Sequence, residues 1–340
     1  MRIALVGAGG MASMHADCYS AIPNATLCGV MDIRAEAATA LAARYGAAPF
    51  TNFDKMLEEI RPDVVDVCCP TPWHVDYVVS AANQAKVFGI KGISTEKPMA
   101  RTLEDCQRMI DAVNGAGIPL FVAHVVRFFP EFKLAAQQVK QGAVGNVASV
   151  RTRRGCPMPH AWNDWYADFS KSGGCILDLI IHDFDWLRWT FGPVQRVFAC
   201  GFPHKEGMQK DYALVTLRFA SGAVGHVEGT WSDPGGFKVT IEVAGDGGLL
   251  EFNANQPTGT PLRIAMANSD VTAAGVAVPE SPTGVNPYQL ELQHFLDCLE
   301  AGVTPSITPY DGMEAVRIAL AAIESVETGR PVTLQSMPAS

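Results

Sequence analysis

Two short stretches carry residue types that suit acid–base chemistry. The first, "STEKPMA", places Lys97 between Glu96 and Pro98. The proline ring disfavours helical geometry for the residue before it, so we expect Lys97 at the end of a strand. If that end opens onto a cleft, the ammonium group can reach a ligand. Otherwise Glu96 and Lys97 form an ordinary solvated pair.

The second stretch, "GGCILDLIIHDFDWLRW", carries Asp178 and His182 four positions apart. On one predicted helix from about Gly174 to Thr190, the two side chains share a face. Apolar neighbours predict that this face is at least half buried. There a carboxylate fixes the tautomer of a histidine and stabilises its charged form, as a general base requires. A core histidine with a structural aspartate is the alternative. Asp183 and Asp185 are expected on other faces, solvated or paired with Arg188.

A glycine-rich turn stands near the start of the chain. "VGAGGMA" gives the pattern G-x-G-x-x-A with Gly7, Gly9 and Ala12, after one predicted strand and before a helix. Such a turn lets main-chain amides approach a pyrophosphate. Asp32 ends the next predicted strand, where a carboxylate accepts hydrogen bonds from ribose hydroxyls and repels a 2'-phosphate. The pattern therefore predicts a dinucleotide site that favours NAD over NADP, although Arg34 would suit a 2'-phosphate.

A metal centre is a competing interpretation of the histidine stretch. Asp178 and His182, with His160 or His204, are possible zinc ligands. No third ligand stands at motif spacing, and hydride transfer to a nicotinamide needs no metal. We therefore predict no metal.

The elements that position these residues follow two patterns. Apolar strands alternate with helical patterns in the first third of the chain, which predicts βαβ units and a parallel sheet; the strands are 2–7, 26–32, 63–69, 92–96 and 119–124, and the helices 34–46, 74–86 and 103–117. After a helix near 126–142, longer β-rich runs predict an antiparallel or mixed sheet; they are 146–155, 194–202, 212–231 and 237–253.

The predicted fold class is therefore α/β with two domains. We expect a Rossmann dinucleotide-binding domain over 1–123 and an α/β substrate-binding and oligomerisation domain with a large open sheet over 124–340. Two helical patterns near the end, 288–302 and 312–329, are expected to pack back on the body, and on the first domain in particular.

Composition limits the possible partners and location. The chain has 340 residues, 48% hydrophobic and 18% charged, which indicates an ordinary globular protein of more than one domain. Its net charge of -9 argues against a nucleic-acid partner. Nine scattered cysteines without a CxxC motif favour reduced thiols and a cytoplasmic location. No apolar run is long enough to span a membrane, and the first sixteen residues suit strand, turn and helix better than a signal peptide.

Taken in order, these motifs resemble one known family. "GAGGMA", Asp32, "PTPWH", "EKP", "GGCILDLIIHDFD" and the ending "SVETGRPVTL" are similar to the glucose-fructose oxidoreductase and inositol dehydrogenase family, Gfo/Idh/MocA, over nearly the whole chain. The resemblance implies a Rossmann domain followed by an α/β domain whose open sheet often forms the oligomer contact. It therefore implies a homo-oligomer, a dimer or tetramer.

The resemblance also implies roles for individual residues. Lys97 would bond the reacting hydroxyl and stabilise alkoxide charge, and His182 would take the hydroxyl proton with Asp178 as its partner. The predicted cofactor-binding residues are Gly7, Gly9, Gly10, Met11, Ala12, Asp32, Ile33, Arg34, Thr71, Pro72, His74, Glu96, Lys97, Pro98 and Arg127. The predicted substrate-binding residues are Lys97, Arg127, Arg154, Trp162, Trp165, Asp178 and His182.

The chain departs from the family pattern at two places. A few more residues than usual separate His74 from Glu96, which we expect to bear on the approach to Lys97. Cys175 replaces the usual third glycine before the predicted helix.

The segment from Arg151 to Gly174 joins a strand to the helix that carries Asp178 and His182. Its aromatic side chains offer faces on which a sugar ring can stack, with polar partners for hydroxyls nearby; they are Trp162, Trp165 and Tyr166, beside His160, Asn163 and Asp164. A domain-closing or subunit-contact role is the alternative.

The sequence therefore predicts a cytoplasmic NAD(P)-dependent oxidoreductase. It would interconvert a secondary alcohol of a sugar or cyclic polyol with its ketone. One alternative is an enzyme of the same fold that uses NAD transiently for sugar elimination or glycoside cleavage. The other is a non-catalytic dinucleotide-binding sensor or regulator.

Overall fold

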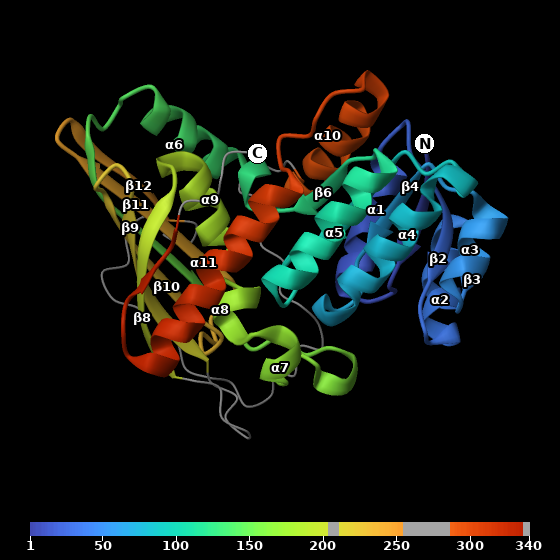
Figure 1. Ribbon diagram of the computed structural model, residues 1–340, viewed down its shortest axis with the longest axis horizontal. Helices are drawn as coiled ribbons and strands as arrows, with labels where there is room; N and C mark the ends of the chain where they lie inside the picture. The colour runs from blue at the N-terminus through green and yellow to red at the C-terminus, as the bar shows by residue number, and fades with distance from the viewer. Residues whose placement is uncertain (203–210, 254–285, 336–340) are drawn as a thin grey trace. The chain divides into compact units, whose positions relative to one another are not determined.

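The computed structural model describes residues 1–202, 211–253 and 286–335 (Figure 1). The chain divides into two compact units. The first unit is Met1–Phe128 with Asn286–Val316, and the second is Phe129–Val285 with Arg317–Ser340. His204, considered above as a metal ligand, lies outside the described residues.

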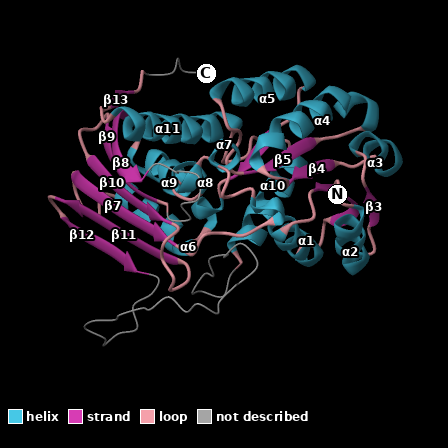
Figure 2. Cartoon of the chain, turned by 90° about the horizontal axis from the view of Figure 1, so that it is seen from below, coloured by secondary structure: helices cyan, strands magenta, loops and turns pink. Residues whose placement is uncertain are grey.

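The first unit is built on a parallel sheet of six strands in the order β3-β2-β1-β4-β5-β6. This is the strand order of a Rossmann fold, as predicted. Figure 2 shows helices α4 and α5 on one side of this sheet and α1 and α2 on the other. The strands are β1 (Arg2–Val6), β2 (Thr26–Met31), β3 (Ala48–Phe50), β4 (Val64–Val67), β5 (Gly92–Glu96) and β6 (Leu120–Ala123). The α-helices are α1 (Gly10–Ala21), α2 (Ala35–Tyr45), α3 (Phe53–Ile60), α4 (His74–Phe88), α5 (Leu103–Ala116) and α10 (Pro287–Ala301).

Strand β3 and helix α3 were not predicted. β3 has three residues, one of them Pro49, and is an edge strand beside β2. α3 has a recognisable start, because the Asn52 side chain accepts a hydrogen bond from the main-chain N–H of Lys55. Its buried residues repeat at helical spacing: Phe53, Met56, Leu57 and Ile60.

The second unit contains a mixed sheet in the order β12-β11-β7-β10-β9-β8-β13. Its strands are β7 (Val147–Gly155), β8 (Val194–Phe202), β9 (Tyr212–Phe219), β10 (Val224–Thr230), β11 (Lys238–Gly245), β12 (Gly248–Asn253) and β13 (Val332–Thr333). Neighbouring strands are antiparallel except β7 and β10, which are parallel. Helices α6 (Pro130–Lys140) and α9 (Ile181–Phe191) cover one face (Figure 2). The α/β fold class with a mixed second sheet is confirmed.

The prediction of a single helix from Gly174 to Thr190 is wrong. It is two helices, α8 (Gly174–Asp178) and α9, separated at Leu179 and Ile180. The carbonyl oxygen of Cys175 accepts both the Leu179 and the Ile180 N–H, so the helix widens by one residue. Ile180 packs against β10 so closely that a Cβ at Gly229 would lie 2.5 Å from its Cγ2 atom. A side chain at position 229 would therefore collide with the residue at the break.

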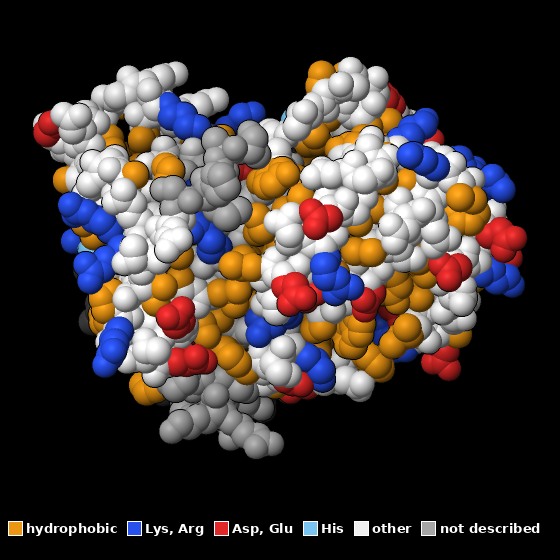
Figure 3. All heavy atoms as spheres, in the orientation of Figure 1, with side chains coloured by type: hydrophobic (Ala, Val, Ile, Leu, Met, Phe, Trp, Pro, Cys, Tyr) orange, Lys and Arg blue, Asp and Glu red, His pale blue; other side chains and the backbone are white. Residues whose placement is uncertain are grey.

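Helix α11 (Pro309–Thr328) contributes residues to both units, whereas α10 belongs to the first. No helix in the described part is long and apolar enough to cross a bilayer. On the face shown in Figure 3, basic and acidic side chains are scattered and do not form a continuous basic stripe.

Candidate active site

The glycine-rich turn lies where the strand order of the first sheet reverses. β1 and β4 are neighbours there, and ligands of such sheets bind outside the carboxyl ends of these strands. Gly7 has φ +104°, and a Cβ at this position would lie 2.8 Å from the carbonyl oxygen of Cys68. A Cβ on Gly9 or Gly10 would meet nothing within 4 Å. The turn therefore packs tightly against the chain after β4 at Gly7, whereas Gly9 and Gly10 leave space in which a phosphate could lie.

Asp32 follows β2 and is 8% exposed. Its Oδ2 atom accepts the Ala8 N–H at 2.9 Å, which ties the carboxylate to the glycine-rich turn. Its Oδ1 atom accepts the main-chain N–H of Arg34 at 2.9 Å and the Nε–H at 3.1 Å. Since Arg34 pairs with the carboxylate, the position suits a ribose diol better than a 2'-phosphate. Ile33 is 63% exposed beside it.

Thr71 and Pro72 begin a short 3-10 helix, Thr71–Trp73, which leads into α4. The predicted cofactor residue His74 has its ring turned toward the main chain. Its Nδ1 lies 2.9 Å from the Pro98 oxygen and its Nε2 lies 2.8 Å from the Cys69 oxygen. Burial lowers the pKa of this histidine. His74 thus links the segment after β4 to the segment after β5.

Lys97 follows directly after β5 and is half buried. The additional residues before Glu96 do not disturb this strand, because β5 pairs with β4 and β6 without a register shift. Glu96 is only 6% exposed, so the alternative of a solvated Glu96–Lys97 pair is wrong. The Oε2 atom of Glu96 accepts the main-chain N–H of Lys97 at 3.1 Å.

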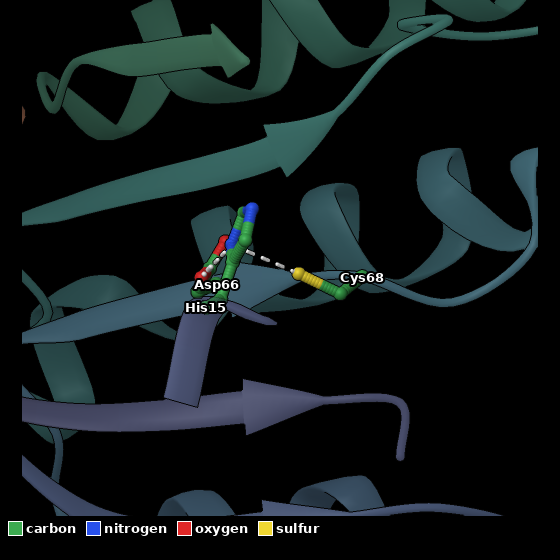
Figure 4. Close-up of side chains that lie close together, drawn as sticks. All are labelled: His15, Asp66 and Cys68. Carbon is green, nitrogen blue, oxygen red and sulfur yellow. Dashed lines mark hydrogen bonds and ion pairs between the residues drawn. The ribbon is translucent and has the colours of Figure 1, made fainter. Parts of the chain in front are cut away.

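A buried polar cluster, which sequence reasoning missed, lies behind Lys97. His15 of α1 is fully buried, with Nδ1 2.8 Å from Asp66 Oδ2 and Nε2 3.1 Å from Glu96 Oε1. Tyr19 donates its hydroxyl to the same Asp66 oxygen at 3.0 Å, and the Cys68 sulfur lies 3.2 Å from Nδ1. Figure 4 shows His15, Asp66 and Cys68 converging. We name these five residues the His15 cluster.

The His15 cluster shifts the pKa values of its members. Burial opposes the charged form of His15, but Cys68 and Asp66 outweigh it and raise the pKa of His15 well above its ordinary value. Burial likewise opposes ionisation of Asp66, yet the His15 ring and the Tyr19 hydroxyl hold its pKa below the ordinary value. Burial raises the pKa of the Cys68 thiol.

His15, Asp66 and Cys68 are also the one described group of His, Cys, Asp and Glu side chains with atoms close enough to hold a metal ion. Their atoms already lie within hydrogen-bond distance of one another in the buried core, and burial raises the pKa of the thiol. This group of three includes neither Asp178 nor His182, the residues considered above as zinc ligands. The Nδ1 atom of His160 lies 3.3 Å from Asp164 Oδ1.

Arg127, a predicted cofactor and substrate residue, is 5% exposed. Its Nη1 donates to the Ser306 oxygen at 3.3 Å and its Nη2 lies 3.4 Å from Asp311 Oδ1. These contacts brace the chain after β6 against the segment that begins α11.

In the second unit, Asp178 and His182 stand on either side of the helix break. Asp178 is 7% exposed and His182 is half buried, so the expected burial of this pair is present. Cys175 takes part in the start of α8: Asp211 accepts its main-chain N–H at 2.9 Å and its thiol at 3.4 Å. A glycine at this position would keep the main-chain bond to Asp211 and lose only the contact from the thiol.

The prediction that Asp183 is solvated or paired with Arg188 is wrong, and Asp185, which is 1% exposed, is not solvated either. Asp183 is fully buried and accepts the Arg154 Nε–H at 2.6 Å. Arg154 is 1% exposed, and its guanidinium also faces the rings of Phe132 and Phe237 at 5.7 Å. This engaged guanidinium favours a structural role for Arg154 over the predicted contact with substrate.

The predicted aromatic segment is ordered around two stacked rings. Trp165 stacks on Tyr166 with centroids 3.9 Å apart, and Tyr166 packs edge-on against Trp231. Trp162 is 44% exposed. Trp162 therefore has the most accessible ring face of the three predicted aromatic residues.

Two family models match this chain. Residues 1–124 match "Oxidoreductase family, NAD-binding Rossmann fold", and residues 132–251 match "GFO/IDH/MocA C-terminal domain". The chain belongs to the Gfo/Idh/MocA family of oxidoreductases. Membership confirms the resemblance found in the sequence, the oxidoreductase class and NAD as the cofactor.

Relatives in this family match over nearly their full length. The myo-inositol 2-dehydrogenase of Thermotoga maritima is 29% identical, over 99% of both chains. GenD2 from gentamicin A biosynthesis, solved with NAD, has a TM-score of 0.85 at 28% identity, over 99% of this chain and 97% of that one. A levoglucosan dehydrogenase solved with NADH and levoglucosan has a TM-score of 0.83 at 25% identity, over 99% of this chain and 100% of that one.

The glycine-rich turn yields a stability prediction. Gly7→Ala forces a Cβ against the Cys68 carbonyl at positive φ, so we expect a loss of about 1–3 kcal/mol in the free energy of unfolding. Denaturant unfolding of the cofactor-free protein measures this. Gly115→Ala is the control, because its Cβ would meet nothing within 4 Å on helix α5. A Gly7→Ala protein as stable as the wild type would refute the steric argument.

The His15 cluster yields a pH prediction. Since the folded pKa of His15 is raised, its stabilising contribution is complete below the unfolded pKa of about 6.5 and declines as the pH rises toward the folded pKa. The difference in melting temperature between wild type and His15→Gln should therefore shrink between about pH 6 and pH 9. Exposed His160, replaced by Gln, is the control and should show little difference. A gap that widens with pH would contradict this assignment.

Proposed function

We propose that this protein is an NAD-dependent dehydrogenase that oxidises a secondary alcohol of a cyclic polyol or sugar to its ketone, or catalyses the reverse. Lys97 donates a hydrogen bond to the reacting oxygen and stabilises the alkoxide charge that develops on it. His182 takes the hydroxyl proton at a ring nitrogen, and Asp178 stabilises the charged ring. The bound dinucleotide supplies a hydride acceptor at its nicotinamide ring.

The observation that carries this proposal is the position of Lys97. It follows β5 at the same edge of the sheet as the glycine-rich turn after β1 and Thr71 after β4. The turn fits a dinucleotide, because Gly9 and Gly10 leave open space and no side chain of the described residues caps α1. Main-chain N–H groups there remain for phosphates. The relatives named for myo-inositol and levoglucosan support the polyol and sugar class.

The assay that tests this function follows nicotinamide absorbance with purified protein and NAD. The substrates are a panel of inositols, levoglucosan, aldoses and uronic acids. Reduction of NAD by one substrate group supports the dehydrogenase. Tight cofactor binding without reduction by any of them would refute it, and sugar released without net NADH would indicate the transient use of NAD.

Lys97→Ala and His182→Ala should each lower kcat by at least about a hundredfold, because each removes a group that acts on the reacting hydroxyl. Cofactor Kd, measured by fluorescence titration with NADH, should stay near the wild-type value in both. Retained turnover in either variant would remove that residue from the mechanism.

Trp162 is proposed to stack against the substrate ring. Trp162→Ala should then raise KM roughly threefold to tenfold with little change in kcat. Initial rates over a range of substrate concentrations measure both constants. An unchanged KM would assign the segment to structure alone.

The open face of the second sheet is proposed as the contact of a homo-oligomer. It exposes Phe198 and Leu214, which are 39% and 42% exposed, beside the cross-strand pair of Arg153 with Glu228. Light scattering of Leu214→Asp against wild type tests the contact, and an unchanged mass would refute it.

All nine cysteines are free, which fits the proposed reducing, cytoplasmic location.

A further inference from the structure

His15 joins three segments that lie far apart in sequence. It belongs to α1, whereas Asp66 lies in β4 and Glu96 ends β5. Each ring nitrogen lies within hydrogen-bond distance of a different carboxyl group. The helix that begins at the glycine-rich turn is thus tied directly to the strand that precedes Lys97.

The donors and acceptors of the His15 cluster favour a charged ring. Ionised carboxylates only accept hydrogen bonds, and a neutral imidazole has a single N–H. A neutral ring would therefore leave one bare nitrogen facing a carboxylate oxygen, at a position that is fully buried. An imidazolium donates to both Asp66 and Glu96. Of the remaining groups around the ring, Tyr19 donates to Asp66, and the Cys68 sulfur lies 3.2 Å from Nδ1, farther than the Asp66 oxygen at 2.8 Å, so the carboxylate is the closer partner of that nitrogen.

Glu96 links His15 to the main chain of Lys97. One of its oxygens faces His15 and the other accepts the main-chain N–H of Lys97 at 3.1 Å. The chain beyond Lys97 is held separately, by His74 at the Pro98 oxygen. The main chain is therefore anchored to the core of the first unit on both sides of Lys97. This fixes the point from which the Lys97 side chain extends.

We propose that His15 is a buried imidazolium and a positioning residue that, through Glu96, fixes the main chain carrying Lys97. The positioning half of this proposal rests on the role of Lys97 proposed above, whereas the charge of His15 does not. Misplacement of a catalytic group by about 1 Å can cost roughly a hundredfold in rate. Positioning of Lys97 thus gives the buried charge of His15 a role, although His15 takes no part in the chemical step.

The charge is tested by NMR of protein labelled with ¹⁵N in histidine rings, at about pH 8, above the ordinary histidine pKa of about 6.5. We expect one buried ring with both nitrogens protonated. In Glu96→Gln this signal should become that of a neutral ring, because the amide presents its NH₂ group to Nε2 while its oxygen accepts from Lys97. This change assigns the signal to His15. A neutral His15 in the wild type would overturn the charge assignment.

The positioning role is tested by kinetics with the panel substrate that gives the highest turnover. Glu96→Ala should lower kcat roughly 10- to 100-fold while KM changes little, and Glu96→Gln should recover most of the lost turnover. Tyr19→Phe is the matched control: it removes the other hydrogen bond to Asp66 and should lower the melting temperature with kcat unchanged.

The outcomes separate this inference from the proposed function. If Lys97→Ala abolishes turnover but Glu96→Ala does not, the positioning role is wrong and the proposed function stands. If Lys97→Ala retains turnover, the catalytic role of Lys97 and the positioning role are both refuted. Loss of kcat in Tyr19→Phe as large as in Glu96→Ala would reduce the cluster to a general structural role.

Discussion

Parallel strands bring loops that are far apart in sequence to one edge of a sheet, and the first unit depends on this constraint. The glycine-rich turn, the segment at Thr71 and the segment at Lys97 follow β1, β4 and β5, which are adjacent in the sheet. Dense packing between these loops restricts their residue types. Gly7 has no space for a Cβ because the chain at Cys68 occupies it.

Fixing such loops requires polar contacts, because their main-chain groups cannot all join the sheet. The first unit uses His15 and His74 for this purpose, one on each side of Lys97. In the second unit, the buried pair of Arg154 with Asp183 holds the first turn of α9 beside His182. Buried charge is costly unless it is paired and hydrogen-bonded, and the pair of Arg154 with Asp183 meets both conditions.

The features predicted correctly from sequence are the local ones. The glycine-rich turn after β1, the position of Asp32 directly after β2 and the strand before Lys97 each follow from a few adjacent residues and their known conformational preferences. The alternation of strands and helices gave the parallel sheet. A family resemblance carried by several motifs in a fixed order gave the oxidoreductase class.

The features that were missed depend on distant contacts. His15 meets Asp66 and Glu96 across 51 and 81 positions, and its only local signal is a histidine on the buried face of a helix. The break between α8 and α9 lies at Leu179 and Ile180, and Ile180 packs against Gly229, 49 positions further along the chain. A helical period of 3.6 residues predicts neither of these contacts.

The most direct measurement of the proposed chemistry uses the panel substrate with the highest turnover, deuterated at its ring carbons, with NAD and the purified protein. Mass spectrometry of the nicotinamide product follows the isotope. The account predicts NADH that carries one deuterium, in an amount equal to the ketone formed. Ketone or other product formed without deuterated NADH would contradict direct hydride transfer from the alcohol carbon.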